Sequence, residues 1–597
     1  MRPLYVLRKV LNCLNQLNPK QLEAVLHKQG PLLVIAPPGS GKTYTICHRI
    51  KALRSAGVEA EKICVLTFTK AATLSMQTRY QNLMGYRDLV YFGTIHALCY
   101  AILSDSNVKK PIHILSELSK TQLVKRLYHE LFPKEKITED IILDLCKGFS
   151  YLSAKKETGE GEEGRLYQAF LKAKEKEKVM DLDDLLLKTL ELLNQEEEVL
   201  KKWQQRFSYF LVDEFQDVNR LQLEILFLLS KKEKNIMAVG DDDQSIYGFR
   251  GSVPGIFKLF EEEYQDLKKV FLDLNYRSFD EIIECGQRCI SRNKDRYEKT
   301  VFGILQKGGR ILYKNYQKET EQIREMVQVI NKKELGKVAV LFRTNGLKQR
   351  FLFLCKKEGL VIGGSKRLEY AKEVLEDLGA YCNLVLGENM ETSLVRILNK
   401  PNRNLGRFYI TEINKDLSNW INMCYSCGER EQAKTIFRLN KDLNNLRQWK
   451  PVLGIQYLFK GMGYDSYATS LGKTYGLLEQ EQEGILKDIA GLVEDCESWE
   501  EAKSRLREEN LSFRQEVADE KISCITMHGA KGLEYDTVFI PYLNDGIIPS
   551  RHGISMEEER RLFYVAITRA KKNLYLLSVK HDKDDKVMVS RFLKELK

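Results

Sequence analysis

The segment of the chain best suited to chemistry is a glycine-containing stretch, APPGSGKT, directly after the apolar run Leu32 to Ala36. Glycines let successive backbone N–H groups turn toward one point and bind an anion, and a helix starting there adds the positive end of its dipole. Lys42 can reach the β- and γ-phosphates of a nucleotide, and Thr43 can offer its hydroxyl to Mg²⁺. This pattern predicts a strand, a phosphate-binding loop and a helix, although Ala36 stands where a first glycine is usual. The expected loop residues are Ala36, Pro37, Pro38, Gly39, Ser40, Gly41, Lys42 and Thr43.

Two carboxylates at the end of a second apolar run form another chemical centre. Tyr209 to Val212 is followed by the residues DEFQD. A carboxylate at a strand end can hold Mg²⁺ directly or through water, and its neighbour can orient and deprotonate a water for attack on a γ-phosphate. We expect Asp213 to bind the metal and Glu214 to activate the water. An acidic surface turn is a poor alternative because the preceding run is wholly apolar.

Two glutamines have amides that suit nucleotide recognition. Gln244 ends the stretch GDDDQ, which follows the apolar run Ile236 to Val239, and it is placed to sense the γ-phosphate. Gln21 lies in the first turn of an expected helix with Asn18 as N-cap and Pro19 as first residue. Its amide can pair with both a donor and an acceptor on adenine, but a solvated glutamine is the simpler alternative.

These residues need a sheet that gathers strand ends at one edge. Short apolar runs, each ending in polar or aromatic residues, predict an open α/β sheet with ligands at the carboxyl ends of its strands. Phe68, Thr94 and His96 follow such runs, although core packing is an alternative for Phe68 and His96. Tyr247, Phe249 and Arg250 interleave aromatic rings with a cation, which suits stacking on bases and holding a phosphate. The predicted strands are Leu32 to Ala36, Ile63 to Thr67, Val90 to Gly93, Tyr209 to Val212 and Ile236 to Val239.

Length and composition indicate a multidomain globular protein. At 597 residues the chain is too long for one core, and its 43% hydrophobic and 30% charged content is ordinary. No apolar run is long enough for a bilayer, and the first 16 residues read as a leading helix rather than a signal peptide. The formal charge of +11 is compatible with a polyanion partner but does not require one.

Cysteine usage favours a reducing cytoplasm. The 13 cysteines are mostly single and in apolar surroundings, as expected for buried thiols. Cys424 and Cys427 form the one tight pair, and the absence of a second Cys/His pair nearby in sequence disfavours a zinc site.

From about Asp105 to Met180 the pattern becomes helical and strongly charged, which predicts an all-helical insertion. Most charges of the stretch Lys155 to Lys178 are expected on a solvated face. The acidic residues that follow, Asp181 to Asp184, suit the N-terminus of the helix that returns to the sheet.

The ordered motifs resemble the UvrD/Rep/PcrA family of superfamily 1 DNA helicases, nearly end to end. They are LNPKQ, APPGSGKT, LTFTKAA, GTIHALC, VDEFQD, VGDDDQSIYGFRGS and NYRS, followed by AVLFRTN, ITMHGAKGLEYD and EEERRLFYVAITRAKKNLYL. The resemblance implies an α/β protein with two RecA-like P-loop domains, parallel sheets flanked by helices, and an inserted helical subdomain in each. The implied limits are 1–104 and 181–273 for domain 1A, 105–180 for insertion 1B, 274–372 and 520–597 for domain 2A, and 373–519 for insertion 2B.

The resemblance also implies roles in an ATP site between the two domains. Gln21 would read adenine and Tyr276 would stack on it, while Glu534 would contact the nucleotide sugar. Arg277 and Arg569 would cross the cleft as arginine fingers, each worth roughly 10³–10⁵ in rate, although a surface ion pair is the alternative for either. Five residues keep the roles given above: Lys42, Thr43, Asp213, Glu214 and Gln244.

A single-strand path is implied along the same strand ends. Stacking on an aromatic ring is worth about 1–3 kcal/mol per base and tolerates any sequence, which suits a motor that passes every base. The family implies 3′-to-5′ movement. The residues implied are Phe68, Thr94, His96, Tyr247, Phe249, Arg250, Asn345, Thr526 and His528.

The leading hypothesis is a cytoplasmic ATP- and Mg²⁺-dependent 3′-to-5′ DNA helicase and translocase that binds single-stranded DNA and single/double-strand junctions, without a membrane. Two departures from the family bear on it: Phe249 stands where relatives mostly have Trp, and the stretch Asn404 to Gly406 replaces a Gly-hydrophobic-Gly turn associated with duplex contact. A translocase that strips bound proteins is therefore an alternative. Another is an ATP-switched DNA-binding subunit of a larger complex with an unidentified protein partner.

Overall fold

The computed structural model describes residues 17–106, 114–115, 117–133, 139–155, 157–246, 248, 255–332, 334–357, 366–403, 405, 417–426, 429–475, 477–518, 522–550, 555–582 and 585–596. The chain divides into two compact units, one formed by residues 1–360 with 524–597 and the other by residues 361–523. The expected leading helix at residues 1–16 lies outside the described residues. Among the described helices, none is long and apolar enough to cross a membrane.

The first sheet has six strands in the order β3-β2-β4-β5-β1-β6, and all of its strand pairs are parallel. The prediction of this sheet is confirmed: two of its strands have the predicted limits, and the third strand starts and ends one residue later than expected. The strands are β1 (Leu32–Ile35), β2 (Ile63–Thr67), β3 (Tyr91–Thr94), β4 (Tyr209–Val212), β5 (Ile236–Gly240) and β6 (Lys268–Phe271).

Helices cover both faces of this sheet because successive strand residues point to opposite sides. In β1, Leu32 and Val34 join one hydrophobic cluster, while Leu33 and Ile35 join another. The first cluster is completed by α2 (Pro19–Leu26), α3 (Lys42–Ser55) and α4 (Lys70–Met84). The second is completed by α5 (Ile95–Ser106), α9 (Leu182–Gln195), α10 (Glu197–Arg206), α11 (Arg220–Ser230) and α12 (Ile256–Glu263).

The predicted helical insertion is confirmed as three helices, α6 (Glu117–Leu131), α7 (Glu139–Lys155) and α8 (Gly161–Glu177). They share a core that includes Phe149 and Phe170. The expected solvated face needs one correction, because Lys174 is buried and its ammonium lies 2.7 Å from Asp184 Oδ2. Lys120 of α6 joins the same cluster, 3.1 Å from Asp181. The acidic N-terminus of α9 therefore holds the insertion through two buried lysines.

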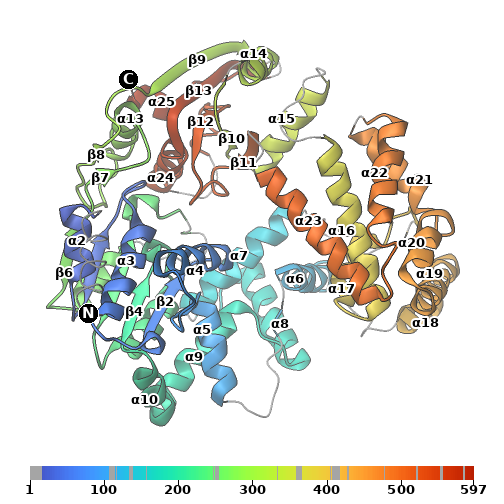
Figure 1. Cartoon of the computed structure of the whole chain (residues 1–597), viewed down its shortest axis with the longest axis horizontal. Helices are drawn as coiled ribbons and strands as arrows, with labels where there is room; N and C mark the ends of the chain where they lie inside the picture. Colours follow the sequence, from blue (N-terminus) through green and yellow to red (C-terminus); the bar gives the residue numbers. More distant parts are fainter. Residues whose placement is uncertain are drawn as a thin grey trace. The chain divides into compact units, whose positions relative to one another are not determined.

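The second sheet has the order β11-β10-β12-β13-β14, and β9 pairs with β13. Strands β10, β12, β13 and β9 run parallel, whereas the short β14 is antiparallel to β13 (Figure 1). Its strands are β9 (Arg310–Lys318), β10 (Val338–Phe342), β11 (Ile522–Thr526), β12 (Tyr535–Ile540), β13 (Ala570–Asp582) and β14 (Asp585–Lys586).

One face of the second sheet packs on α13 (Asp280–Ile290), α24 (Met556–Ile567) and α25 (Arg591–Leu596). Helices α14 (Glu319–Lys332) and α15 (Asn345–Lys357) also pack against its strands. A small ladder of β7 (Leu274–Asn275) and β8 (Phe302–Gly303) stands apart from both sheets. The predicted fold, two RecA-like α/β domains with helical insertions, is confirmed.

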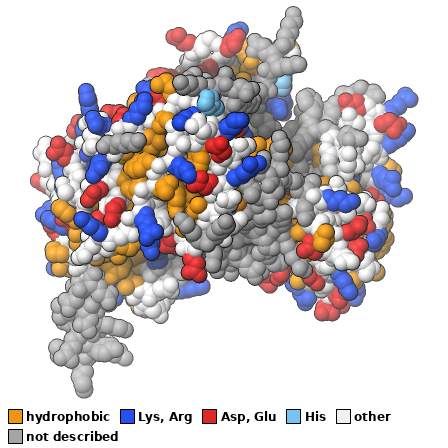
Figure 2. Space-filling view, turned by 90° about the horizontal axis from the view of Figure 1, so that it is seen from above, with side chains coloured by type: hydrophobic (Ala, Val, Ile, Leu, Met, Phe, Trp, Pro, Cys, Tyr) orange, Lys and Arg blue, Asp and Glu red, His pale blue; other side chains and the backbone are white. Residues whose placement is uncertain are grey.

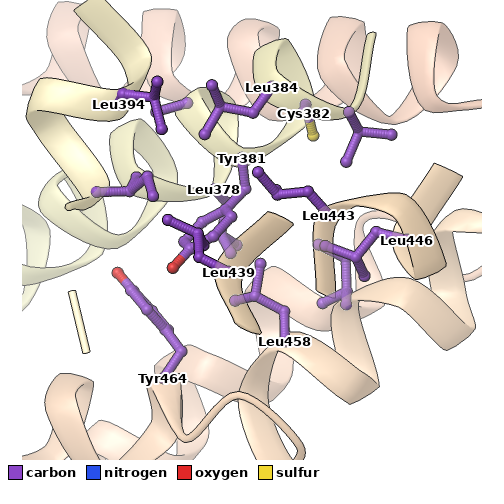
Figure 3. Close-up of a cluster of buried hydrophobic side chains, with 14 of the residues drawn as sticks. Leu378, Tyr381, Cys382, Leu384, Leu394, Leu439, Leu443, Leu446, Leu458 and Tyr464 are labelled. Carbon is purple, nitrogen blue, oxygen red and sulfur yellow. The ribbon is translucent and has the colours of Figure 1, made fainter. Parts of the chain in front are cut away.

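The described part of the second unit is helical, and its two longest helices, α16 (Lys366–Leu386) and α23 (Trp499–Ala518), pack together (Figure 1). Figure 3 shows the core, in which Tyr381 and Leu384 of α16 lie among leucines of α19 and α20, with Tyr464 of α21 close to Tyr381. Its other helices are α17 (Met390–Ile397), α18 (Leu417–Ser426), α19 (Arg430–Gln448), α20 (Pro451–Lys460), α21 (Tyr464–Thr474) and α22 (Glu479–Gly491).

Two sequence features of this unit fall partly outside the described residues. Cys424 is buried in the helical core, but Cys427 is not described. Leu405 is buried. Its neighbours Asn404 and Gly406, in the turn that differs from the family pattern, are not described.

Candidate active site

The loop between β1 and α3 needs its glycines. Gly39 and Gly41 have φ angles of 76° and 85°, in the left-handed region that favours glycine. A Cβ on Gly39 would lie 2.7 Å from Asn275 Oδ1, and one on Gly41 would lie 2.8 Å from Gln21 Nε2. Because the side chains pack this tightly against the loop, larger residues at either glycine would displace them.

Gln21 is fixed against the same loop. The expected N-cap is confirmed: Asn18 Oδ1 accepts from Gln21 N at 2.8 Å, and Asn18 N donates to Gln21 Oε1 at 3.2 Å. The other end of the Gln21 amide donates from Nε2 to Ser40 O at 3.0 Å, and the side chain is buried. A glutamine held at both ends is more constrained than the solvated residue that the sequence alone allowed.

Lys42 and Thr43 begin α3 at the end of the loop. Lys42 Nζ donates to Ala36 O at 3.0 Å, and Thr43 is half-buried in the first turn. The loop backbone is also held by a residue of β7, since Asn275 Nδ2 donates to Pro38 O at 2.8 Å. Tyr276 N donates to Gly39 O at 2.9 Å, so the segment leading into the second sheet touches the loop directly.

Asp213 and Glu214 lie at the end of β4, which is paired with β2 and β5. Asp213 Oδ1 accepts from Glu214 N at 3.0 Å. Burial and the neighbouring Glu214 raise the pKa of Asp213 to about 7. Burial would also raise the pKa of Glu214, but the Lys42 and Lys531 ammonium groups outweigh it and leave this pKa below its usual value. One carboxyl group of the pair therefore stays ionised, and the other is easily protonated unless a cation joins it.

Glu214 has an unusual backbone conformation. Its φ of 51° is uncommon for a residue with a Cβ, and such strain is often concentrated at functional sites. Its side chain is held by Gln216, whose Nε2 donates to Glu214 Oε2 at 2.6 Å. The side-chain oxygen Oε1 of Gln216 accepts from Asp241 N at 3.0 Å, which links this turn to the end of β5.

Two cationic side chains from the part of the chain that carries the second sheet contact residues that follow strands of the first sheet. Arg569 is fully buried between α24 and β13, and its Nη2 donates to Gln244 Oε1 at 3.3 Å. Lys531 donates from Nζ to Gln244 O at 2.9 Å and to Asp217 Oδ1 at 2.7 Å. Burial and the nearby Arg277 lower the pKa of Arg569 to about 9. The γ-phosphate sensor predicted at Gln244 is therefore in contact with both cations.

The remaining predicted nucleotide residues gather at the same place. Arg277 donates from Nε to Glu534 Oε2 at 2.8 Å and from Nη1 to Thr568 O at 3.4 Å. Tyr276 is 43% exposed, and its hydroxyl accepts from Asn18 Nδ2 at 2.8 Å, beside Gln21. The Tyr276 ring is therefore accessible to solvent beside the buried Gln21 side chain.

Sequence reasoning missed four residues that hold this site together. Gln216, Asp217, Asn275 and Lys531 orient the carboxylates or fasten the loop to the second sheet. Each lies within a motif already singled out, so proximity in sequence was the available signal. Their polar types alone did not show which of them would be buried.

The predicted strand-tracking residues lie at carboxyl ends of strands in both sheets. In the first, Phe68 follows β2 and Thr94 ends β3, and the ends of these two strands are register partners. His96 lies in α5, and burial lowers its pKa. In the second sheet, Thr526 ends β11, and Asn345 begins α15 directly after β10.

Four further predicted residues complete this group. His528 is half-buried, two residues beyond β11. Tyr247, Phe249 and Arg250 lie outside the described residues.

On the described part of the face in Figure 2, Lys and Arg side chains are interspersed with Asp and Glu. The net positive charge therefore does not by itself mark a path for a polyanion on that face.

The fold and this arrangement define the class. The chain has two mainly parallel sheets, a glycine-containing loop at the end of a strand in the first, and basic side chains near the second that contact Gln244, the predicted γ-phosphate sensor. These features are typical of P-loop nucleotide hydrolases with paired RecA-like domains.

Comparison with known proteins identifies the family of the chain. The UvrD/REP helicase N-terminal domain matches residues 17–265, and the UvrD-like helicase C-terminal domain matches residues 270–447 and 476–581. The chain therefore belongs to the UvrD/Rep/PcrA family of superfamily 1 helicases. It is 31% identical over 615 residues to the ATP-dependent DNA helicase PcrA of Leuconostoc citreum, covering 94% of this chain and 82% of the relative. It is 28% identical to the PcrA proteins of Staphylococcus aureus strain Mu50 and Staphylococcus epidermidis, covering 98% and 97% of this chain and 86% of each relative.

Proposed function

We propose that this protein is an ATP-dependent DNA helicase that moves 3′-to-5′ along single-stranded DNA and unwinds duplex at single/double-strand junctions. One observation carries the proposal: buried Arg569 of the second sheet contacts Gln244 of the first, directly beside the carboxylates and the phosphate loop. A nucleotide bound there would be held by both sheets. The names of the PcrA relatives support ATP and DNA as the two substrates.

In this proposal the chain's own groups carry out ATP hydrolysis. Glu214, kept ionised by nearby cations, orients a water and takes its proton as the water attacks the γ-phosphate. Lys42, Arg277 and Arg569 neutralise charge that develops on the phosphates. Gln21 and Tyr276 hold the adenine.

The residues also fit a bound Mg²⁺. Asp213 is a buried carboxylate whose pKa is raised to about 7 when no cation accompanies it, which is the environment expected of an oxygen ligand. Asp213 and the Thr43 hydroxyl would hold the ion, which would supply charge neutralisation for the phosphate oxygens.

Hydrolysis would then be coupled to movement. Loss of the γ-phosphate removes a group that both sheets bind, so the sheets alternate between closed and open arrangements. Strand-tracking residues on each sheet would grip and release the DNA in turn. Ten described cysteines are buried and none of these is in a disulfide, which supports a reducing cytoplasm as the site of action.

A second candidate is a translocase that strips bound proteins and unwinds little by itself, or a DNA-binding subunit that works with a protein partner. The residues Asn404 to Gly406 favour it, since they replace a turn associated with duplex contact in the family. The helicase and the translocase would share the ATP site and differ in strand separation, whereas the DNA-binding subunit would depend on its partner for the chemistry.

The test combines ATP hydrolysis with unwinding. Hydrolysis is measured with and without single-stranded DNA, and unwinding is measured on forked duplexes carrying only a 3′ or only a 5′ tail. The helicase proposal predicts DNA-stimulated hydrolysis and unwinding of the 3′-tailed fork alone. Stimulated hydrolysis without unwinding, together with displacement of a protein bound to single-stranded DNA, would favour the second candidate. Hydrolysis insensitive to DNA would contradict both.

A further inference from the structure

A buried lysine binds the three carboxylates that follow β5. Lys299 lies in the segment between α13 and β8, and its side chain is 2% exposed. Its Nζ is 2.6 Å from Asp241 Oδ1 and 2.7 Å from Asp243 Oδ2, and it also pairs with Asp242. Oxygens of the three carboxylates lie within 4.8 Å of one another, a spacing that a metal ion could use. The ammonium group takes that position instead.

Neighbours of Lys299 bind the same carboxylates. Arg296 makes two hydrogen bonds to Asp243, at 2.9 and 2.7 Å, and Tyr297 N donates to Asp242 Oδ2 at 2.8 Å. The segment 296–299 therefore contacts every carboxylate of the cluster. Three residues earlier, Asn293 donates from Nδ2 to Glu557 O at 2.9 Å, which fastens the segment to α24 of the second sheet.

The cluster is connected to the predicted γ-phosphate sensor. The second oxygen of Asp241, Oδ2, accepts from Gln244 Nε2 at 2.8 Å. The opposite end of the Gln244 amide, Oε1, accepts from Arg569 Nη2 at 3.3 Å. Lys299, Asp241, Gln244 and Arg569 thus form a continuous chain of contacts, with its ends in the second-sheet part of the protein and its middle in the first.

We propose that Lys299 is a positioning residue for ATP hydrolysis, which keeps Asp241 ionised and thereby fixes the Gln244 amide with its carbonyl toward Arg569. This inference rests on the proposed function. An ionised carboxylate can only accept hydrogen bonds, so Gln244 must present its NH₂ group to Asp241 and its carbonyl oxygen to the arginine. A protonated Asp241 can donate instead, and the orientation of the amide is then set by Arg569 alone.

The charge balance of the cluster supports this role. Burial would raise the pKa of Asp241, but the Lys299 ammonium, together with Lys42 and the Gln244 hydrogen bond, outweighs that effect and leaves the pKa below its usual value. Lys42 acts on Asp241 in the same direction, but more weakly. Without Lys299, three adjacent carboxylates at the end of a buried strand would depend on Arg296 and more distant cations, and one of them would take up a proton.

The alternative is that the cluster only fastens the two sheets together. The test therefore compares Lys299→Met with Lys258→Met in the full chain. Lys258 pairs at 2.7 Å with Asp295, next to the same segment, but its side chain is 66% exposed. The three measurements are kcat and KM for ATP with saturating single-stranded DNA, affinity for a fluorescent ATP analogue, and thermal unfolding.

The expected result is a loss of about 10²-fold in kcat for Lys299→Met, since a displacement of about 1 Å in a positioned group can cost that much. Nucleotide affinity should stay near wild type, Lys299→Arg should regain most of the turnover, and Lys258→Met should behave as wild type. Wild-type kcat in a folded Lys299→Met protein would overturn the proposal. Equal losses in nucleotide affinity and kcat would also overturn it, because they would indicate a purely structural role.

A second pair of variants applies if Lys299→Met does not fold. Asp242 contacts Lys299 but not Gln244. Asp242→Asn therefore removes one of the negative charges that Lys299→Met leaves unpaired, and it changes no contact of the Gln244 side chain. The double variant Lys299→Met/Asp242→Asn should have a kcat about 10²-fold below that of Asp242→Asn alone. Equal kcat values for the two would overturn the proposal.

Chemical rescue tests the ammonium itself. Lys299→Ala should regain part of its turnover in ethylammonium chloride but not in tetramethylammonium chloride at the same ionic strength, because only the former can donate hydrogen bonds to Asp241. Equal responses to both salts would count against the positioning role. A wild-type chain without DNA-stimulated hydrolysis would contradict the proposed function, whereas normal turnover in both wild type and Lys299→Met would contradict only the role of Lys299.

Discussion

Two carboxylate clusters at the ends of neighbouring strands, β4 and β5, differ in where their positive charge comes from. After β5, Asp241 to Asp243 bind Lys299, a permanent cation of the chain, and Asp243 also binds Arg296. After β4, Asp213 has no such partner within hydrogen-bonding distance among the described residues, and its pKa is raised to about 7. The comparison teaches that acidic residues at neighbouring strand ends can differ in role: the cluster after β5 already holds cations of the chain, and we propose that the one after β4 receives a cation and a water.

A third cluster shows that an internal lysine does not by itself imply a catalytic connection. Lys120 and Lys174 form ion pairs with Asp181, Asp183 and Asp184 at the start of α9. The ammonium of Lys174 also lies 4.7 Å from the centre of the Phe170 ring. Nothing in the described contacts of this cluster reaches the nucleotide residues, so we regard it as a structural anchor for the helical insertion.

The largest expected effect comes from the cluster after β4. Glu214→Gln removes the group that takes the proton from water but keeps its shape, so turnover should fall by roughly 10²–10⁴-fold while nucleotide binding is retained. DNA-stimulated hydrolysis and affinity for a fluorescent ATP analogue measure the two quantities separately. Near-normal hydrolysis in this variant would remove Glu214 from the catalytic role and would erase the proposed contrast between the clusters.

The next effect concerns the structural anchor. Lys174→Met leaves Asp181 and Asp184 with one buried cation fewer and should destabilise the insertion by about 3 kcal/mol. Hydrogen exchange of α8 and thermal unfolding measure this, with Lys176→Met, an exposed lysine of the same helix, as the control. The kcat of folded Lys174→Met should equal that of wild type. A large fall in kcat without lost stability would show that this cluster resembles the one at Lys299.

The sequence predicted most of what is local. The strands, the N-cap at Asn18 and the strand-loop-helix segment from β1 to α3 each depend on neighbouring residues, and the structure confirms these elements. Lys299 could not be predicted in this way, because it lies 58 residues from Asp241 in a charged stretch with no periodic signal. Lys174 was expected on a solvated face for a related reason: a run of mixed charges does not show which lysine will meet the acidic start of another helix.

The predicted nucleotide-binding residues could be predicted from the sequence only in part. Gln244 and Arg569 were singled out separately: the role of Gln244 was predicted from its place after a strand, and the role of Arg569 came from the family resemblance. Their contact depends on how two sheets, far apart in sequence, face each other, which no local pattern specifies. The roles themselves remain predictions until variants are measured.

The smallest expected effect concerns the cation that we propose for Asp213, after β4. Because burial raises the pKa of folded Asp213 to about 7, the native state binds more protons than the unfolded state between the usual Asp pKa and that value. Without Mg²⁺, the wild-type protein should therefore lose stability as the pH rises from about 4 through about 7. Asp213→Asn should remove this loss, and at pH 8 without Mg²⁺ it should unfold at a higher temperature than wild type.

Added Mg²⁺ should reverse the order of the two proteins. It should raise the unfolding temperature of wild type with bound nucleotide, whereas Asp213→Asn should respond only at concentrations about tenfold higher, which corresponds to a difference of about 1.4 kcal/mol in binding. Asp242→Asn is the matched control, since its cluster already contains Lys299 and should leave the Mg²⁺ response as it is. If instead Asp242→Asn weakened that response and Asp213→Asn did not, the assignment of the two clusters would have to be exchanged, because the ion would then bind after β5.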